Sequence, residues 1–260
     1  MHGKTWLYAG NLFWTCTRFL REPEETISRE VGYILEQMIC KLSNQQLDVL
    51  TGLILGDGYL EYNGYRGTRL QVKQSEERKE YVFWLYSQFA HITKTPPQQR
   101  QDTKQWYFGT RFFENLEEFR KLFYANRTKR VPSNIIDMFQ SPLTLAVWFM
   151  DDGRLDYRAK SHYAYHISTD SFTESDVKKL QEVLLERFGI VAKTYLSLCR
   201  GKLYPKLYIG KEGRDLFTKI VAPHILSCFR YKLPPDLFSK NLDPSETTRR
   251  APTSKSRVMI

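Results

Sequence analysis

The sequence predicts an α+β fold built from two related repeats, each with the element order αββαββα. The stretch LTGLILGDGYL, Leu50 to Leu60, returns as LAVWFMDDGRL, Leu145 to Leu155, at an offset of 95 residues. A repeat at a fixed distance indicates a duplicated structural unit. The same offset also pairs core-type residues further along the chain: Leu70 with Tyr165, Val72 with Ile167, Val82 with Val177, Leu85 with Leu180 and Phe89 with Leu184.

These pairs predict how the chain is divided. We expect a first repeat over residues 43–135 and a second over residues 141–238. Residues 1–42 form an N-terminal extension, and residues 239–260 form a polar, mobile C-terminal tail.

Composition narrows the class of protein. Of the 260 residues, 42% are hydrophobic, which is enough for sizeable cores. The net charge of +10 favours an anionic partner, nucleic acid before a membrane surface, and no apolar run reaches the ~18 residues of a transmembrane helix. The 4 cysteines and 5 histidines lack the spacing of a zinc site, so we expect reduced thiols and no structural zinc.

Each repeat opens with a helix that carries a start signal. Ser43 and Gln46 match a capping box, while Ser141 and Pro142 supply an N-cap and a first-turn proline. We expect these two helices to pack together, because small residues permit a close approach: Thr51, Gly52, Gly56 and Ala146.

The remaining elements follow the same order in both repeats. Alternating strands are expected at Thr68 to Gln74 and at Tyr163 to Thr169. Amphipathic helices follow at 76–89 and 173–188, the second closed by Gly189. Hairpins turning near 102–103 and near Gly201 come next, and a shorter helix ends each repeat.

Helices on one face of each sheet leave the other face open, and that face carries the predicted nucleic-acid contacts. Apart from Ser168, its side chains are basic or amide-bearing, and the strand segments that supply them contribute few acids. Arg, Lys and Gln are the side chains that hold phosphates and read base edges. The predicted DNA-binding residues are Arg69, Gln71, Lys73, Arg100, Lys104, His166, Ser168, Lys193, Arg200, Lys202 and Lys206.

The acid at the end of each opening helix is the candidate for chemistry. A single Asp-Gly pair is equally compatible with an ordinary helix stop, but Asp57-Gly58 and Asp152-Gly153 stand at the same place in both repeats. If the two helices pack together, two like charges meet and require cations between them. Mg²⁺ suits two carboxylates completed by phosphate oxygens, the arrangement for hydrolysis of a phosphodiester.

The two motifs resemble those of the LAGLIDADG homing endonucleases, and LAVWFMDDG is similar to the form found in the single-chain, omega-type intron-encoded branch. STDSFT at 168–173, YKLP at 231–234 and the SPLTLA lead-in at 141–146 also resemble that branch. The resemblance covers residues 43 to 238. It implies a pseudo-twofold protein whose two sheets form a β-saddle over DNA, with the motif helices at the interface between the repeats.

The resemblance also implies roles for individual residues. Asp57 and Asp152 become the metal ligands, one for each strand cut, and Gln74 resembles a polar residue that orders active-site water. Its counterpart in the second repeat is Thr169 or Asp170. Lys232 resembles the basic residue that helps neutralise developing charge. Its counterpart in the first repeat is Lys129 or Arg130, and we favour Lys129.

The leading hypothesis is a monomeric, site-specific DNA endonuclease that makes a double-strand break in a long asymmetric target and drives intron homing. It would use two or more Mg²⁺ ions, with Mn²⁺ as a substitute. The alternatives are an RNA maturase that binds its own intron RNA, and a non-cleaving DNA-binding regulator on the same fold. The resemblance suggests an organelle, mitochondrion or chloroplast, or otherwise the cytoplasm, and not secretion.

Overall fold

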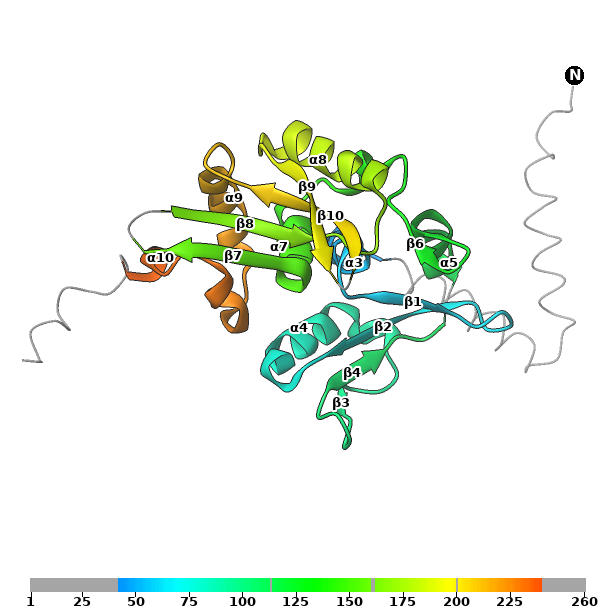
Figure 1. The fold of residues 1–260 in the computed structure, drawn as a ribbon. Coiled ribbons are helices and arrows are strands. Elements are labelled where there is room, and N and C mark those ends of the chain that lie inside the picture. The colour runs from blue at the N-terminus through cyan, green and yellow to red at the C-terminus, as the bar shows by residue number, and fades with distance from the viewer. Residues whose placement is uncertain (1–41, 113, 160–161, 200, 240–260) are drawn as a thin grey trace, which may run out of the picture.

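The computed structural model describes residues 42–112, 114–159, 162–199 and 201–239 (Figure 1). The first repeat contains α3 (Asn44–Leu55), β1 (Tyr59–Tyr62), β2 (Thr68–Gln74), α4 (Lys79–Phe89), β3 (Gln98–Gln99), β4 (Trp106–Gly109) and α5 (Glu114–Phe123). The second contains α7 (Pro142–Asp152), β7 (Gly153–Arg158), β8 (His162–Ser168), α8 (Glu174–Phe188), β9 (Lys193–Cys199), β10 (Lys202–Ile209) and α9 (Arg214–Val221). The αββαββα order is therefore confirmed in both repeats.

The helix boundaries follow the capping signals of the sequence. Ser43 and Gln46 form the reciprocal capping box at the start of α3. The Ser141 side chain accepts a hydrogen bond from Leu143 N at the start of α7. Gly189 ends α8 with a φ of 67°, a left-handed conformation that glycine adopts without steric cost.

Each repeat folds its four strands into one antiparallel sheet. The strand orders are β1-β2-β4-β3 and β7-β8-β10-β9, so the two sheets have the same topology. Along β2, buried residues alternate with partly or fully exposed ones. Leu70 and Val72 face the helices, whereas Arg69, Gln71 and Lys73 lie on the open face. The alternation expected for this strand is confirmed.

Helices α3 and α7 pack against each other between the two sheets (Figure 1). Their contact is close because glycine removes side-chain bulk at two points. A Cβ on Gly52 would lie 2.6 Å from Thr144 O, and a Cβ on Gly56 would lie 2.5 Å from Asp151 Cβ. These distances are far below van der Waals contact, so any side chain there would push the helices apart. The prediction of a close helix pair is confirmed.

Shorter segments connect and close the repeats. The hairpin β5 (Tyr124–Ala125) and β6 (Thr128–Lys129) follows α5, and α6 (Ile135–Met138) leads into α7. Short 3-10 helices lie at Glu76–Arg78, Ala90–Ile92, Ala222–His224 and Ser227–Lys232, and α10 covers Asp236–Ser239. Within the described ranges, no helix has the length and apolar character needed to cross a membrane.

Three predictions concern residues outside the described parts of the chain. The N-terminal extension lies there except for residue 42, and so does the tail from residue 240 onward. Arg200, a predicted DNA-binding residue in the β9–β10 turn, also lies outside the described residues.

Candidate functional site

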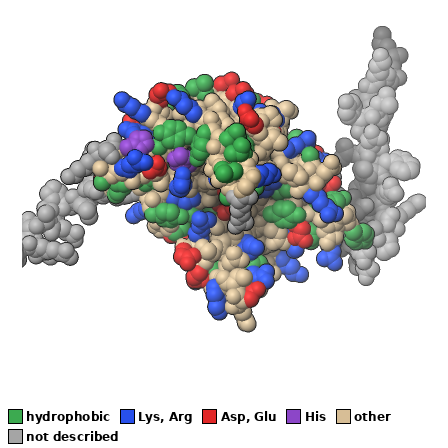
Figure 2. Space-filling model, viewed as in Figure 1, with side chains coloured by type: hydrophobic (Ala, Val, Ile, Leu, Met, Phe, Trp, Pro, Cys, Tyr) green, Lys and Arg blue, Asp and Glu red, His purple; other side chains and the backbone are tan. Residues whose placement is uncertain are grey.

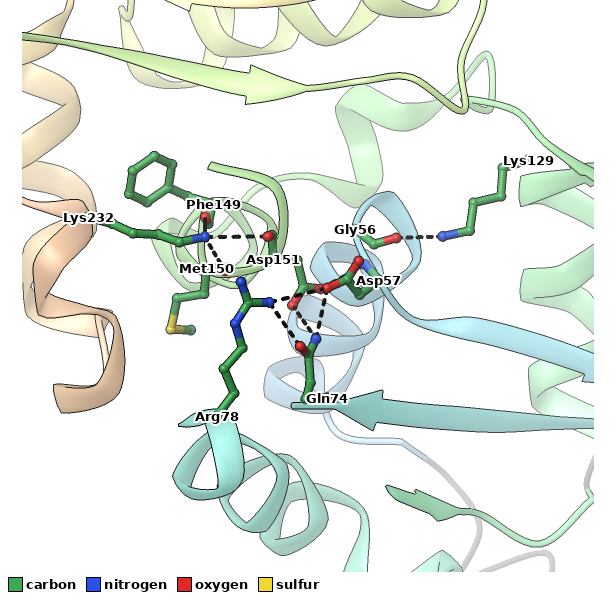
Figure 3. Close-up of polar contacts among 9 residues, drawn as sticks. All are labelled: Gly56, Asp57, Gln74, Arg78, Lys129, Phe149, Met150, Asp151 and Lys232. Atoms are coloured by element: carbon green, nitrogen blue, oxygen red, sulfur yellow. Dashed lines mark hydrogen bonds and ion pairs between the residues drawn. The ribbon is translucent and has the colours of Figure 1, made fainter. Parts of the chain in front are cut away.

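The carboxyl ends of α3 and α7 meet, and they bring three carboxyl groups together. Asp57 follows α3, and Asp151 and Asp152 are the last two residues of α7. The backbone N–H of Asp57 donates to Asp151 Oδ2 across the helix contact, at 3.0 Å (Figure 3). Gly56 makes room for this bond, because Asp151 occupies the space that its side chain would fill. The packing of two helices thus creates the acidic cluster.

The adjacent acids Asp151 and Asp152 have different surroundings. Asp151 is only 6% exposed and holds the end of α3, which makes it a structural part of the helix interface. Asp152 is partly exposed, and the side chain of Asp57 is 44% exposed. The two acids that are accessible to a ligand are therefore those that precede Gly58 and Gly153.

Gln74 and Arg78 hold the carboxylate of Asp57 from the side of the first sheet (Figure 3). Gln74 Nε2 donates to Asp57 Oδ2 at 2.9 Å. Arg78 Nη1 donates to Gln74 Oε1 at 2.9 Å and lies 3.6 Å from Asp57 Oδ2. Because the arginine can only donate, it fixes which end of the Gln74 amide faces the acid. The Arg78 guanidinium also lies 5.3 Å from the ring centre of Phe229, so it connects the two repeats.

Two lysines approach the ends of the motif helices from opposite sides (Figure 3). Lys129 Nζ donates to Gly56 O at 2.6 Å. Lys232 Nζ lies near three carbonyl oxygens of the last turn of α7, those of Phe149, Met150 and Asp151, at 3.2, 2.5 and 3.4 Å. A cation at a helix C-terminus satisfies unpaired carbonyls and offsets the negative end of the helix dipole. The lysines thus compensate for acids placed at the unfavourable end of each helix.

Arg130, the alternative to Lys129, points elsewhere. Its Nε and Nη2 donate to Leu122 O and Lys121 O, at 2.9 and 2.8 Å. Lys129 is the residue of this pair that reaches the acidic cluster.

Loss of contact with water and mutual repulsion raise the pKa values of Asp151 and Asp152. Burial and then the charge of Asp57 raise the pKa of Asp151 well above its usual value. The same two causes, in that order, raise the pKa of Asp152 to about 7. Burial lowers the pKa of Lys129, and burial followed by the charge of Arg78 lowers the pKa of Lys232 to about 8. The cluster therefore gains stability from an added positive charge.

These residues fit a divalent cation that is completed by a phosphate ligand. Among the described residues, no three His, Cys, Asp or Glu side chains are placed to hold a metal by themselves. Mg²⁺ commonly uses one or two carboxylates and takes its other ligands from water and substrate phosphates. Asp57 and Asp152 can supply those carboxylates, and a cation between them would relieve the repulsion that raises the pKa of Asp152.

The second repeat surrounds Asp152 with different residues. Thr169, at the position that corresponds to Gln74, turns away and donates to Pro205 O at 2.5 Å. Asp170 contributes to raising the pKa of Asp152 and pairs with Lys206, 3.2 Å away. Of the two candidates for the counterpart of Gln74, Asp170 is the one whose charge reaches the site.

Within the described parts of the chain, which exclude Arg200, the predicted DNA-binding residues lie on the two open sheet faces and their hairpins. Beside Asp57, the first sheet forms a hollow of about 1120 Å³, lined among others by Gln71, Lys73, Gln74 and Arg100. On the second sheet, the register aligns His166 with Tyr208, and Ser168 with Lys206. Lys73, Lys104, Lys193 and Lys202 are exposed.

The expectation that this surface is poor in acids is wrong in part. Arg69 pairs with Glu61, Arg100 with Asp102 and Lys206 with Asp170, at 2.6, 2.9 and 3.2 Å. Lys193 lies 3.9 Å from Glu212. These acids lie on neighbouring strands and turns, so no single strand contains both members of a pair. Figure 2 shows acidic side chains among the basic ones on the side of the molecule that it displays.

The sequence did not identify Arg78 or the role of Asp151. Arg78 follows Gln74 by four residues, but the turn between them, which includes the 3-10 helix Glu76–Arg78, directs its side chain back to the site. The double acid Asp151-Asp152 was visible, and only the packing of α3 against α7 shows that the first acid serves the interface.

Comparisons with known proteins agree with this geometry. The family model of the LAGLIDADG DNA endonuclease family matches residues 47–216. The chain is 29% identical over 203 residues to the cytochrome b mRNA maturase bI2 of Debaryomyces hansenii, covering 74% of each chain. It is 27% identical over 210 residues to the DNA endonuclease I-ChuI of Chlamydomonas applanata, covering 74% of this chain and 95% of that protein.

A solved structure shares the fold. The homing endonuclease I-WcaI, bound to its DNA recognition sequence, superposes with a TM-score of 0.65 at 24% identity. The match covers 75% of this chain and 88% of that one.

Proposed function

Because the chain belongs to the LAGLIDADG DNA endonuclease family, we propose that it is a site-specific DNA endonuclease that makes a double-strand break in a long asymmetric target. Intron homing is the biological role that this activity serves. The observation that carries the proposal is the meeting of Asp57 and Asp152, one from each repeat, at the ends of two helices packed through glycine. The similarity to the DNA endonuclease I-ChuI supports it.

In this proposal each repeat contributes one acid to a single cleavage centre. Divalent cations held there, two or more Mg²⁺ ions with Mn²⁺ as a substitute, would supply activation of water and stabilisation of charge on the scissile phosphate. Asp57 and Asp152 would hold these cations. Gln74 donates to one oxygen of Asp57, which leaves the other oxygen for binding.

The lysines and Arg78 supply positive charge around the acids. Lys129 and Lys232 interact electrostatically with the acids of the cluster. Their positive charges would stabilise the negative charge that develops on the phosphodiester in the transition state. Arg78 acts through Gln74, whose amide it orients.

The two open sheet faces form the surface on which duplex DNA binds. Exposed lysines neutralise phosphates, and Arg69 and Gln71 face the base edges in the major groove. One chain contains both halves of this surface, so a monomer is sufficient for one target. We also propose that the protein acts in an organelle, on the basis of the family resemblance.

The test is incubation with Mg²⁺ and DNA of the uninterrupted host gene, scored for a discrete double-strand break. A double-strand break at one position, absent in EDTA, is the expected result. Persistent absence of cleavage on a duplex that the protein binds specifically would instead favour a DNA-binding regulator.

A second candidate function is that of an RNA maturase, which the similarity to cytochrome b mRNA maturase bI2 favours. A competition experiment separates the two. Preference for structured intron RNA over duplex DNA, with faster splicing of that intron in vitro, would support the maturase. Preference for duplex DNA and cleavage of it would support the endonuclease.

A further inference from the structure

Glu61 is an acid on the sheet face that is proposed to bind DNA, and it contacts two of the residues expected to read bases. It lies on β1, and its Oε2 accepts from Arg69 Nε at 2.6 Å and from Gln71 Nε2 at 2.8 Å. The hydrogen bond from Arg69 is the main cause that lowers the pKa of Glu61, so the acid is ionised at neutral pH. Its charge opposes DNA phosphates and lowers affinity for every sequence.

The contact with Glu61 limits what Arg69 can present to a ligand. Its Nε edge is used by Glu61, and its guanidinium lies 4.8 Å from the ring centre of Phe112. Neither Nη nitrogen makes a hydrogen bond to another residue in the described parts of the chain. Two adjacent N–H donors at the end of an arginine match the O6 and N7 acceptors of guanine.

The same contact fixes the amide of Gln71. Its Nε2 donates to Glu61, so Oε1 is the end available to a ligand. The side chain lies over Gly109, where an added Cβ would be 3.0 Å from Gln71 Oε1. Beside it, Arg69, Gln71, Gln98 and Tyr107 are among the residues that line a hollow of about 280 Å³. An acceptor at this point suits the exocyclic amine of adenine or cytosine.

We propose that Glu61 is a specificity-determining residue, which holds Arg69 to read a guanine and Gln71 to read the amino group of a nearby adenine or cytosine. The proposal rests on the proposed function, in that the open face of the first sheet lies against the edges of base pairs. Glu61 itself touches no base and acts through the two side chains it orients.

The second repeat provides a matched control. Asp156 occupies the position that corresponds to Glu61, and its strand partner is Ala164, where the first sheet pairs Glu61 with Arg69. Asp156→Ala removes the same charge from the other half of the surface without disturbing an arginine on the facing strand.

The experiment selects bound duplexes from a pool with a randomised target region, in Ca²⁺ so that binding is read without cutting. The wild-type protein, Glu61→Ala, Glu61→Gln, Arg69→Ala, the Glu61→Ala/Arg69→Ala double variant and Asp156→Ala are compared. Melting temperatures verify that each variant is folded. Glu61→Gln keeps an acceptor oxygen and a similar shape, so it remains informative if Glu61→Ala is unstable.

The wild type is expected to prefer guanine at one position by about tenfold over other bases. Glu61→Ala and Arg69→Ala should each reduce that preference to within about twofold, and the double variant should reduce it no further. Glu61→Gln should retain at least about threefold preference, and Asp156→Ala the full value.

Intact guanine preference in Glu61→Ala, with tighter binding to all sequences alike, would overturn the proposal, because Glu61 would then only oppose phosphates. A wild type that binds specific duplexes without this guanine preference would overturn it as well. If the selection with the wild-type protein yields no enriched sequence, both the proposed function and this inference are wrong. This outcome differs from the two above, in which the wild type does select specific sequences.

Discussion

In the first repeat, the strand after the motif helix ends in Gln74, whose amide contacts Asp57 under the control of Arg78. In the second repeat, Thr169 stands at that position and donates to a backbone carbonyl, and Thr173 stands where Arg78 would be and caps α8. The acids, the lysines and the helix packing are shared by the two repeats. The polar residues around each acid are not, so the two halves of the site are expected to act with unequal efficiency.

Substitution of the acids, which both repeats share, should have the largest effect on cleavage. Asp57→Asn and Asp152→Asn should each reduce double-strand cleavage to below about a thousandth of wild type, because a lost metal ligand removes several kcal/mol of charge stabilisation. Specific binding should stay within about tenfold, ~1.4 kcal/mol, since the acids contact few bases. Cleavage gels and binding in Ca²⁺ measure the two quantities.

Two results would contradict the prediction that both repeats contribute a catalytic acid to one centre. Wild-type cleavage by either variant would show that the repeats do not share one centre. Loss of folding in both variants, seen as a lost thermal transition, would show that the acids are structural.

Substitution of Lys129 or Lys232, one from each repeat, should have the next largest effect. Lys129→Met and Lys232→Met should each slow cleavage by about 10²-fold, since each removes one fixed positive charge. Lys232→Met should also cost more stability, by about 1–3 kcal/mol, because three helix-end carbonyls lose a buried donor where Lys129 serves one. Single-turnover rates and urea unfolding test both statements. Equal losses of stability in the two variants would contradict the expectation that Lys232 stabilises its helix end more than Lys129 does.

Arg78 and Thr173 sharpen the comparison, because they occupy corresponding positions. Arg78→Ala should slow cutting of one strand by about 10- to 100-fold through the misplaced Gln74 amide. Thr173→Ala should cost about 1 kcal/mol of stability through the lost helix cap and slow neither strand selectively. End-labelling of each strand separately reads the two rates. Equal slowing of both strands in Arg78→Ala would mean that Arg78 serves the whole site.

Single surface lysines should have the smallest effect. Neutralising Lys104 or Lys202 should weaken binding to all sequences similarly and lower the salt slope by about 0.9. Arg100→Gln should do less, because Arg100 is paired with Asp102. Titrations at several salt concentrations measure this. A salt slope near zero for the wild type would remove the argument for a basic DNA-binding surface.

The fold was predictable from local signals. Capping residues, apolar periodicity and the 95-residue repeat are contained in short stretches of chain, and the helices and strands follow them closely. The sequence favoured Lys129 over Arg130 without deciding between them, because adjacent residues point in opposite directions and only the path of β6 shows which one faces inward.

The packing of the two motif helices was predicted, but individual side-chain contacts between elements were not predictable in this way. The hydrogen bond of Asp151 with Asp57 N depends on how closely α3 and α7 pack, and Glu61 acquires its role through the register of β1 with β2. Such contacts join residues whose separation in sequence carries no periodic signal.

The measurement that tests the account most directly is the consensus of DNA targets cut by the wild-type protein. A randomised duplex pool is incubated with Mg²⁺, and both ends of each cleaved molecule are sequenced. The account predicts a single long consensus whose two halves are unlike, because two different sheet faces of one chain read them. A perfect palindrome, cut with two chains bound per site, would contradict it.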